Sequence, residues 1–363
     1  MRLLLQQFVL GLFASSFAMS GATCGSSSSP HEVQAADGTQ AAAAAGPLAQ
    51  GGELFARYCA LCHGQSGEGY VADNANALNN PELLATATDS FLRVAVARGR
   101  VGTPMSAWSN TYGGPLSSSD IESLVKLMRS WQSTPSVRLP NLRIRGDIAK
   151  GSALYAKHCA ACHGPQGAGQ TAPTLNNPIF HGTVNDAFIR YAIEHGRSGT
   201  PMPRFSETLG AQDLDNVTAF VRSLRTDGHR KAAAVLPDVP LVINPKGPAP
   251  KFELREDFYV PAAQVKAALD AKARLVIADA RAPSDYLEAH IPGAISLPFY
   301  AVAEYAEKLP KDGTWIIAYC ACPHAASGRV ARALRDRGFE HTAVLDEGIR
   351  VWTETGYPVT KAE

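Results

Sequence analysis

A long internal repeat in the middle of this 363-residue chain limits its possible folds more than any other feature. The stretch GGELFARYCALCHG, which begins at Gly51, is matched by KGSALYAKHCAACHG, which begins at Lys150. Further on, LNNPELLATATDSFLRVAVARGRVGTPM is matched by LNNPIFHGTVNDAFIRYAIEHGRSGTPM. Self-similarity of this kind means that one structural unit occurs twice. We therefore expect two small domains of the same fold, over residues 49–133 and 147–225.

Each copy of the repeat ends in a segment with apolar residues at helical spacing. These residues are Ile121, Leu124, Val125, Met128 and Trp131 in the first copy and Leu214, Val217, Val221 and Leu224 in the second. Their intervals of three and four residues place them on one face of an amphipathic helix. Ser119 and Glu122 further predict a capping box at the start of the first of these helices. Both domains are therefore expected to be mostly helical.

A Cys-x-x-Cys-His motif occurs once in each copy, with a spacing that suits covalent attachment of haem. Cys59, Cys62 and His63 have offsets of i, i+3 and i+4, so a helix presents them on one face. Two thiols there form thioethers with the vinyl groups of a porphyrin, and the imidazole faces the iron. The same pattern recurs at Cys159, Cys162 and His163. The alternative is a zinc site made from both cysteine pairs. The distance of 100 residues between the pairs, and a histidine at the same offset in both, favour two haem c groups.

Met105 and Met202 occupy matching places in the two copies and are the candidate sixth ligands of the two irons. Each follows Thr-Pro in a turn-like segment, although the whole chain has only five methionines. A thioether is a soft ligand, and His/Met ligation raises the reduction potential of a haem. The alternative is that each methionine fills a gap in the core. A haem with protein ligands on both sides has no open coordination site, so it transfers electrons.

Through its two Cys-x-x-Cys-His motifs and the two matching methionines, the stretch from residue 49 to residue 225 resembles two tandem class I cytochrome c domains. The resemblance implies two all-α domains, and it implies a proline whose carbonyl accepts a hydrogen bond from the haem histidine. Pro173 stands at that place in the second copy, whereas the first copy has Asn76. Because hydrogen bonds to the ligands tune a metal site, this difference predicts unequal reduction potentials.

Arg100 and Arg197 follow a glycine shortly before the methionine of each copy. An arginine there is suited to a charge-assisted contact with a haem propionate. The alternative is that both are ordinary solvated arginines.

The character of the sequence changes after the second copy. Residues 134–146 join the two repeats, and the proline- and alanine-rich residues 226–251 form a semi-rigid linker. From residue 252 to residue 361, short β-branched runs such as ARLVIADA and GTWIIAYC alternate with helical segments. This alternation predicts an α/β domain with a largely parallel sheet.

The stretch TWIIAYCACPHAASGR places a cysteine at the end of a predicted strand and before a helix. Backbone N–H groups of such a loop converge on an anion, and the N-terminus of the following helix favours a thiolate. Cys320 is therefore the candidate catalytic nucleophile, which would carry a second sulfur atom as a persulfide. Cys322 is a candidate resolving thiol for it.

Residues 252–361 resemble a single-domain rhodanese, a family that transfers sulfane sulfur and has some inactive members. The matching residues are Asp279, Arg281, His290 to Ala294, Cys320, Gly348 and Trp352. The usual active loop reads Cys-x-x-Gly-x-Arg, and this chain lacks its glycine and arginine. Arg329 could reach an anionic substrate from the helix instead. We expect Asp279 and Arg281 to be a structural pair at the end of a strand.

Three other interpretations of the cysteine cluster remain open. The domain could be an inert docking module that keeps only the fold. Cys320, Cys322 and His324 could bind a soft metal ion. His324 could also be an exposed loop residue without a role.

The N-terminal residues 1–23 have one basic residue and then an apolar run, which is typical of a secretory signal. Cleavage after Ser16-Phe17-Ala18 by ordinary signal peptidase is one reading of this segment. In the other, Gly21-Ala22-Thr23-Cys24 resembles a bacterial lipoprotein box, so that Cys24 is lipidated and residues 24–48 form a flexible tether. Cys24 is the cysteine left over when six of seven are assigned, which favours the lipoprotein.

Charge excludes one class of function, because Lys and Arg number 34 and Asp and Glu number 33. Nucleic-acid binding needs a basic patch or stripe that this balance does not suggest. The sequence thus predicts two all-α class I cytochrome c domains followed by an α/β rhodanese-like domain. We expect a periplasmic, lipid-anchored bacterial electron carrier that serves a redox protein of a respiratory chain. Small sulfur compounds would react at Cys320, unless the rhodanese-like domain only docks.

Overall fold

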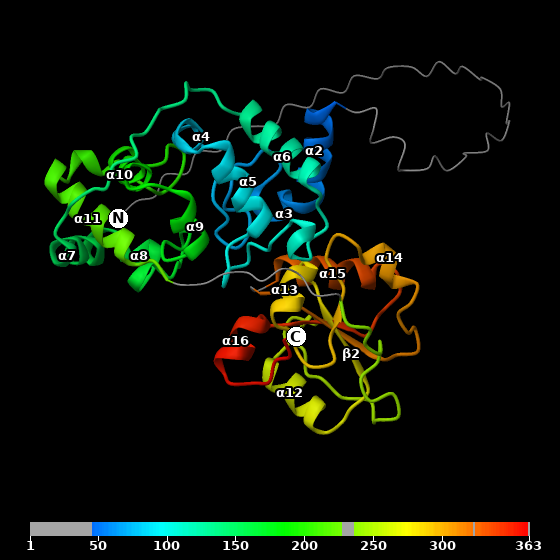
Figure 1. The fold of residues 1–363 in the computed structure, drawn as a ribbon. Coiled ribbons are helices and arrows are strands. Elements are labelled where there is room, and N and C mark those ends of the chain that lie inside the picture. Colours follow the sequence, from blue (N-terminus) through cyan, green and yellow to red (C-terminus); the bar gives the residue numbers. More distant parts are fainter. Residues whose placement is uncertain (1–45, 227–235, 322–323, 362–363) are drawn as a thin grey trace, which may run out of the picture. The chain divides into compact units, whose positions relative to one another are not determined.

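The computed structural model describes residues 46–226, 236–321 and 324–361. Within these ranges the chain forms two helical domains and a C-terminal α/β domain (Figure 1). The predicted signal segment 1–23, the lipidation site Cys24 and the tether up to residue 45 lie outside the described residues. The candidate resolving thiol Cys322 also lies outside them.

The first helical domain contains five α-helices and one 3-10 helix: α2 (Pro47–Tyr58), α3 (Ala60–His63), α4 (Pro81–Thr86), α5 (Asp89–Arg98), η1 (Asn110–Tyr112) and α6 (Ser118–Ser130). Helix α6 buries Ile121, Leu124, Val125 and Met128, as its apolar spacing predicts. The predicted capping box is wrong by two residues. Ser117 and Asp120 form it, whereas Glu122 pairs with Arg93 on α5.

The second helical domain repeats this order with α7 (Ile148–His158), α8 (Ala160–His163), η2 (Pro165–Gly167), α9 (Pro178–Thr183), α10 (Asp186–His195), η3 (Phe205–Glu207) and α11 (Ala211–Ser223). An arginine on the last helix of each domain holds the same three groups. Arg129 binds the carbonyls of Leu84 and Ala87 and the carboxylate of Asp89, and Arg222 binds those of His181, Val184 and Asp186. The two copies therefore share their tertiary contacts as well as their sequence motifs.

A glycine lets the first and last helices of each domain cross closely. A Cβ atom on Gly51 of α2 would lie 2.4 Å from the carbonyl oxygen of Ser123 on α6. On Gly151 of α7 it would lie 2.0 Å from the carbonyl oxygen of Asn216 on α11. Both oxygens belong to a helix backbone, which cannot yield locally.

We expect Gly151→Ala to lower the free energy of unfolding of the second domain by about 1–3 kcal/mol, the usual cost of overpacking a core. Denaturant unfolding followed by circular dichroism measures this loss. Gly182→Ala on α9 is the matched control, because an added Cβ there meets no atom within 4 Å. Equal stability of the two variants would contradict the crossing argument.

The C-terminal domain has a five-stranded, all-parallel sheet with the strand order β1-β5-β4-β2-β3. The strands are β1 (Tyr259–Val260), β2 (Leu275–Asp279), β3 (Ile295–Ser296), β4 (Trp315–Tyr319) and β5 (Thr342–Leu345). The helices between and after them are α12 (Ala262–Asp270), α13 (Pro283–Glu288), α14 (Val302–Ala306), α15 (Ala325–Arg335) and α16 (Gly348–Glu354). The predicted α/β domain with a parallel sheet is confirmed.

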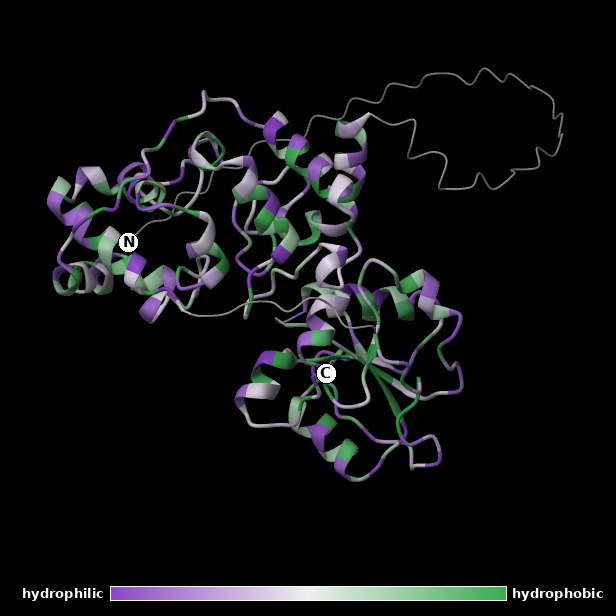
Figure 2. Ribbon diagram, viewed as in Figure 1, coloured by the Kyte–Doolittle hydropathy of each residue, from purple (hydrophilic) through white to green (hydrophobic). Residues whose placement is uncertain are grey.

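The hydropathy of the strands and helices in this domain matches the burial of the sheet. Every residue of β2 is buried, and all of them before Asp279 are apolar. In Figure 2 the strands of the sheet are drawn largely in green, the colour of hydrophobic residues, while the helices carry both colours. A strand covered on both faces has a continuous apolar sequence of this kind. The carboxyl ends of β2 and β4 are neighbours, since Asp279 pairs in register with Tyr319. Residues that follow these two strands therefore lie close together.

In the described part of the chain, we find no helix with the length and apolar character that crossing a membrane requires.

Candidate functional site

Both Cys-x-x-Cys-His motifs fold as one short helical turn. In the second domain, Cys159 caps α8 and His163 ends it, and His163 N donates to Cys159 O at 2.9 Å. In the first domain, Cys59 caps α3 and His63 ends it in the same way, and His63 N donates to Cys59 O at 3.0 Å. Each turn ends because the following glycine has a φ of 76° to 78°. The two thiols and the imidazole of each motif therefore project from one turn, as predicted.

The imidazole of each motif is held by a backbone carbonyl. The distance from His63 Nδ1 to Asn76 O is 2.9 Å, and that from His163 Nδ1 to Pro173 O is 2.8 Å. A donating Nδ1 leaves Nε2 as the metal-binding atom and fixes the ring orientation. Burial lowers the pKa of both histidines, which favours the neutral form that binds metals. The predicted difference in these hydrogen bonds is wrong, because any residue can supply a backbone carbonyl.

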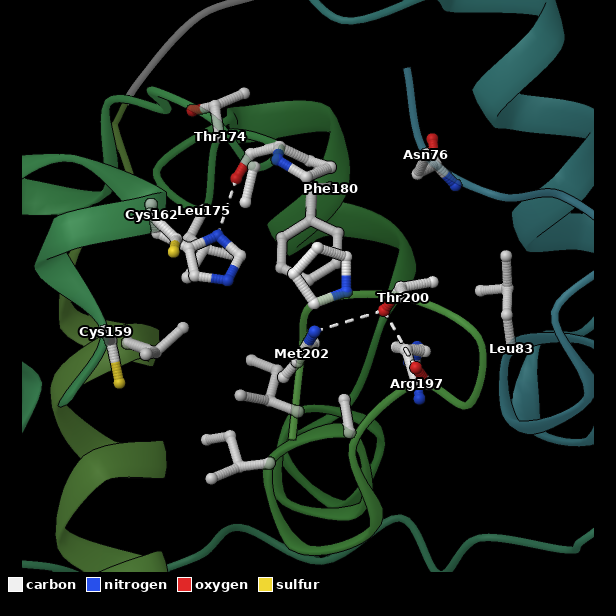
Figure 3. A pocket seen from close by; sticks show the side chains of 18 of the residues that line it. Asn76, Leu83, Cys159, Cys162, Thr174, Leu175, Phe180, Arg197, Thr200 and Met202 are labelled. Carbon is white, nitrogen blue, oxygen red and sulfur yellow. Dashed lines mark hydrogen bonds between the residues drawn. The ribbon is translucent and has the colours of Figure 1, made fainter. Parts of the chain in front are cut away.

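The loops that carry the two methionines are closed by the same hydrogen bonds. Thr200 Oγ1 donates to Arg197 O at 2.8 Å and accepts from Met202 N at 3.2 Å (Figure 3). Thr103 makes the same two contacts beside Met105, at 2.8 and 3.2 Å. The repeated Thr-Pro-Met sequence thus encodes a rigid turn that fixes the start of each methionine side chain. Sequence reasoning noted this threonine only as part of a turn and missed its role.

A cavity of about 310 Å³ separates the second Cys-x-x-Cys-His turn from the second methionine. Cys159 and Cys162 line it from one side, and the loop of Arg197, Thr200 and Met202 lines it from another (Figure 3). Its other walls are mostly apolar and include Phe180, Ile189, Ile193, Val217 and Val221. A cavity with an imidazole, a thioether, two thiols and apolar walls fits a haem c.

The predicted arginines also line this cavity. Arg100 and Arg197 each donate to the carbonyl of the preceding glycine, at 3.1 and 3.2 Å, and each stacks on a phenylalanine. Burial lowers the pKa of both guanidinium groups to about 10. Among the described residues, neither forms an ion pair with a carboxylate. Both side chains are half-buried, and a partly desolvated cation beside a cavity is suited to an anionic ligand, which favours the interpretation as propionate contacts.

The two helical domains face each other through reciprocal contacts. Asn80 of the first domain donates to the carbonyl of Ser198 at 2.9 Å, and Asn177 of the second donates to that of Val101 at 2.9 Å. Each acceptor follows the predicted arginine of its own copy. Phe91 and Phe188 also occupy equivalent positions, and the centroids of their rings are 5.4 Å apart. Residues of the first domain, such as Asn76 and Leu83, therefore reach the second domain's cavity (Figure 3).

Cys320 lies at the carboxyl end of β4 and is only 1% exposed. Its Sγ is 3.2 Å from Oγ of Ser327, which belongs to the first turn of α15. Its carbonyl accepts from Ile349 N at 3.0 Å. The strand–loop–helix arrangement predicted around this sulfur is present. Ser327 carries no sequence signal that would have marked it as a neighbour.

Cys320 also lies near the first Cys-x-x-Cys-His turn. Helix α15, whose first turn contacts the Cys320 sulfur through Ser327, packs against α3, which carries Cys62. Burial raises the pKa of Cys62, and the neighbouring Asp73 carboxylate raises it further.

His324 is half-buried, so the interpretation as an exposed loop residue does not fit. Its φ is 89°, in the left-handed region that usually takes glycine. Its Nε2 lies 3.0 Å from the carbonyl and 3.1 Å from the carboxylate of Asp346, and its ring packs on Tyr259 at 4.1 Å. His324 thus adopts a glycine-like conformation in a loop that lacks the usual glycine, and it anchors that loop to the end of β5. Among the described residues, no group of three or more His, Cys, Asp or Glu side chains is arranged to hold a metal ion.

Asp279 and Arg281 form the structural pair expected at the end of β2. Arg281 donates through Nε at 2.9 Å and through Nη2 at 2.6 Å to the two oxygens of Asp279. Tyr319 donates to the same carboxylate at 2.9 Å and accepts from Ile291 N at 3.1 Å. Arg281 also donates to Ala289 O at 2.6 Å. The fully buried carboxylate thus joins β2, β4 and the loop before β3.

Comparison with known proteins agrees with this architecture. Residues 46–128 and 146–221 match the family described as cytochrome c oxidase, cbb3-type, subunit III. Residues 261–355 match the rhodanese-like domain family.

Individual relatives are similar over the helical domains. The cbb3-type cytochrome c oxidase subunit FixP of Azorhizobium caulinodans is 29% identical over 182 residues, which are 48% of this chain and 59% of that protein. FixP of Bradyrhizobium diazoefficiens is 28% identical over 184 residues, which are 48% of this chain and 60% of that protein. The chain thus spans less than two thirds of the length of these relatives. Among solved structures, a thiosulfate sulfurtransferase from Pseudomonas aeruginosa is 33% identical, with a TM-score of 0.27. That match covers 29% of this chain and 20% of the other.

Proposed function

We propose that this chain, which joins cytochrome c domains to a C-terminal rhodanese-like domain, is an exported dihaem electron carrier that binds or transfers sulfane sulfur at Cys320. The observation that carries the electron-transfer part is the cavity between the second Cys-x-x-Cys-His turn and Met202. The same turn and the same methionine loop recur in the first domain.

In this proposal each haem c is bound covalently and held on both faces. Cys59 and Cys62 attach the first haem, and Cys159 and Cys162 attach the second. His63 and Met105 would hold the first iron, and His163 and Met202 would hold the second. Arg100 and Arg197 provide the positive charges that face the propionates. A haem that these residues hold on both faces would supply one-electron chemistry.

The reciprocal contact between the helical domains supports transfer from one haem to the other. The carbonyl of Asn76, which holds the first imidazole, belongs to a residue that lines the second domain's cavity. The first haem's surroundings therefore adjoin the second haem's site. Electrons would leave towards a redox protein of a respiratory chain, which the similarity to subunits of a cbb3-type oxidase supports. Lipidation of Cys24 would hold the protein at the periplasmic face of a membrane.

The sulfur chemistry proposed for Cys320 is a transfer between two anions. Its thiolate attacks the outer sulfur of thiosulfate, the S–S bond of thiosulfate breaks, and sulfite leaves with the bonding pair. Cys320 then carries a persulfide, which a second nucleophile such as cyanide removes. The N-terminus of α15 and the Ser327 hydroxyl stabilise negative charge on this sulfur.

A pyridine haemochrome assay tests the haem assignment. We expect two haems per chain when the protein matures in a host with a haem c attachment system. Cys159→Ser together with Cys162→Ser should reduce the count to one, because only the first motif stays intact. A count of one or none in the wild type would refute the repeat argument.

A thiosulfate:cyanide transfer assay tests the sulfur site. We expect the wild type to be active and Cys320→Ser to lose all activity above background, because serine cannot carry the transferred sulfur. Cys322→Ser is the control, and it should keep the first transfer. Equal background rates in the wild type and Cys320→Ser would support the alternative, an electron carrier with an inert rhodanese-like docking module.

A further inference from the structure

The segment that follows the first methionine is buried, whereas its counterpart in the second domain is exposed. Ser106, Ala107 and Trp108 are 5%, 0% and 6% exposed. The equivalent residues directly after Met202, Pro203 and Arg204, are both exposed. The two methionine loops have the same internal hydrogen bonds, so a neighbour outside the loop accounts for this difference.

That neighbour is helix α13 of the rhodanese-like domain. Ser106 Oγ donates to Asp285 Oδ2 at 2.6 Å. Ser284 Oγ donates to the carbonyl oxygen of Ala107 at 2.8 Å. All three side chains in these bonds are at most 5% exposed, so water does not compete for them. Two consecutive residues after Met105 are therefore tied to two consecutive residues of α13.

The first Cys-x-x-Cys-His turn and its surroundings also contact the rhodanese-like domain. Helix α15, which begins in the loop after Cys320, packs against α3, which carries Cys62 and His63. Tyr58, the residue before Cys59, packs edge-on against Tyr300, with 4.8 Å between the ring centroids. The ring centroids of Trp108 and Phe299 are 6.4 Å apart. In keeping with this cover, His63 is buried and Cys62 half-buried, whereas His163 is half-buried and Cys162 exposed.

We infer that the rhodanese-like domain is a built-in positioning partner of the first haem: through Ser284 and Asp285 it fixes the Met105 loop, and through α15 it covers the turn that carries His63. The first haem, and not the second, then responds to changes in the rhodanese-like domain. This inference rests on the proposed ligation of the first iron by His63 and Met105.

Two physical effects connect this cover to the reduction potential. The two hydrogen bonds directly after Met105 restrain its loop and thereby favour the thioether as a ligand of the iron, and loss of that ligand lowers the potential. Exclusion of water from the haem surroundings disfavours the extra positive charge of the ferric state, which raises the potential. Both effects act on the first haem, so the first potential is the higher of the two. Unequal cover replaces the unequal histidine hydrogen bonds as the reason for unequal potentials.

Redox titration of the full-length dihaem protein tests the inference, with Ser284→Ala and Ser106→Ala as the two variants. Each removes one hydroxyl donor and leaves every haem ligand in place. We expect each variant to lower the first potential and weaken the first haem's sulfur-to-iron absorption band, while the second haem keeps both properties. Met202→Ala, which lowers the second potential alone, shows which of the two steps of the titration belongs to which haem. Arg204→Ala is the matched control at the uncovered loop, and it should change neither potential.

The two kinds of failure are distinguishable. A wild-type protein without sulfur-to-iron bands overturns the proposed ligation itself. Two bands in the wild type that Ser284→Ala and Ser106→Ala leave unchanged overturn the positioning role and leave the proposed function intact. Equal shifts of both potentials also overturn it, because the inference confines the effect to the first haem. If one alanine variant misfolds, the other alone carries the test, because each removes a separate hydrogen bond, and the same outcomes apply.

Discussion

Met202→Ala should lower the reduction potential of the second haem and remove its sulfur-to-iron absorption band, while the first haem keeps both. Loss of the thioether removes the ligand that stabilises the ferrous state relative to the ferric state. The expected drop is on the order of 0.1–0.3 V, well inside the range of about 0.8 V over which axial ligands set haem potentials. Spectroelectrochemical titration of the intact protein measures both quantities. Met105→Ala should produce the mirror result at the first haem.

The control for this experiment is another methionine of the same chain. Met128 lies on α6, is 3% exposed and packs in the core of the first domain. Met128→Leu conserves its volume, so it should leave both potentials unchanged and cost less than about 1.5 kcal/mol of stability. If Met202→Ala kept both bands, another side chain would be the sixth ligand. If Met128→Leu removed a band, the repeat would have been aligned to the wrong methionines.

Asp279→Ala should destabilise the rhodanese-like domain strongly and leave the haem spectra unchanged. The carboxylate is fully buried and accepts bonds from Arg281 and from Tyr319. Its removal leaves an uncompensated guanidinium in the interior, which costs about 3–5 kcal/mol. Burial by itself lowers the pKa of Arg281, and the charge and hydrogen bonds of Asp279 raise it overall, so the variant also loses the group that compensates the buried guanidinium. Hydrogen exchange of the β2 and β4 amides in the full chain measures the loss.

A second carboxylate of the same domain provides the comparison. Asp270 pairs with Lys266 one helical turn away on α12, at 2.6 Å, but it is exposed. An exposed pair at this spacing contributes roughly 0.3–0.5 kcal/mol, so Asp270→Ala should be nearly neutral. Replacement of Asp279 and Arg281 together by apolar residues should recover part of the loss, because no unpaired charge then remains. If Asp279→Ala were as mild as Asp270→Ala, the carboxylate would not be the anchor described above.

The local sequence determined the two helical domains and the candidate haem ligands. Cys59, Cys62 and His63 lie within one helical turn, so their spacing alone fixes a common face. Met105 follows a threonine whose two hydrogen bonds stay within its own loop. The apolar run of β2 likewise predicted a strand covered on both faces. These features depend on residues a few positions apart, which pattern reasoning detects.

The tertiary structure decided the contacts that join distant parts of the chain. The carbonyl of Asn76 holds His63 as well as a proline would, because the main chain offers an acceptor at every residue. Ser106 and Asp285 are 179 residues apart in the sequence and meet at 2.6 Å in the fold. Neither belongs to a motif, and a buried hydroxyl looks the same in sequence as an exposed one. Such a pair exists only once packing has excluded water from both partners, and that depends on the whole chain.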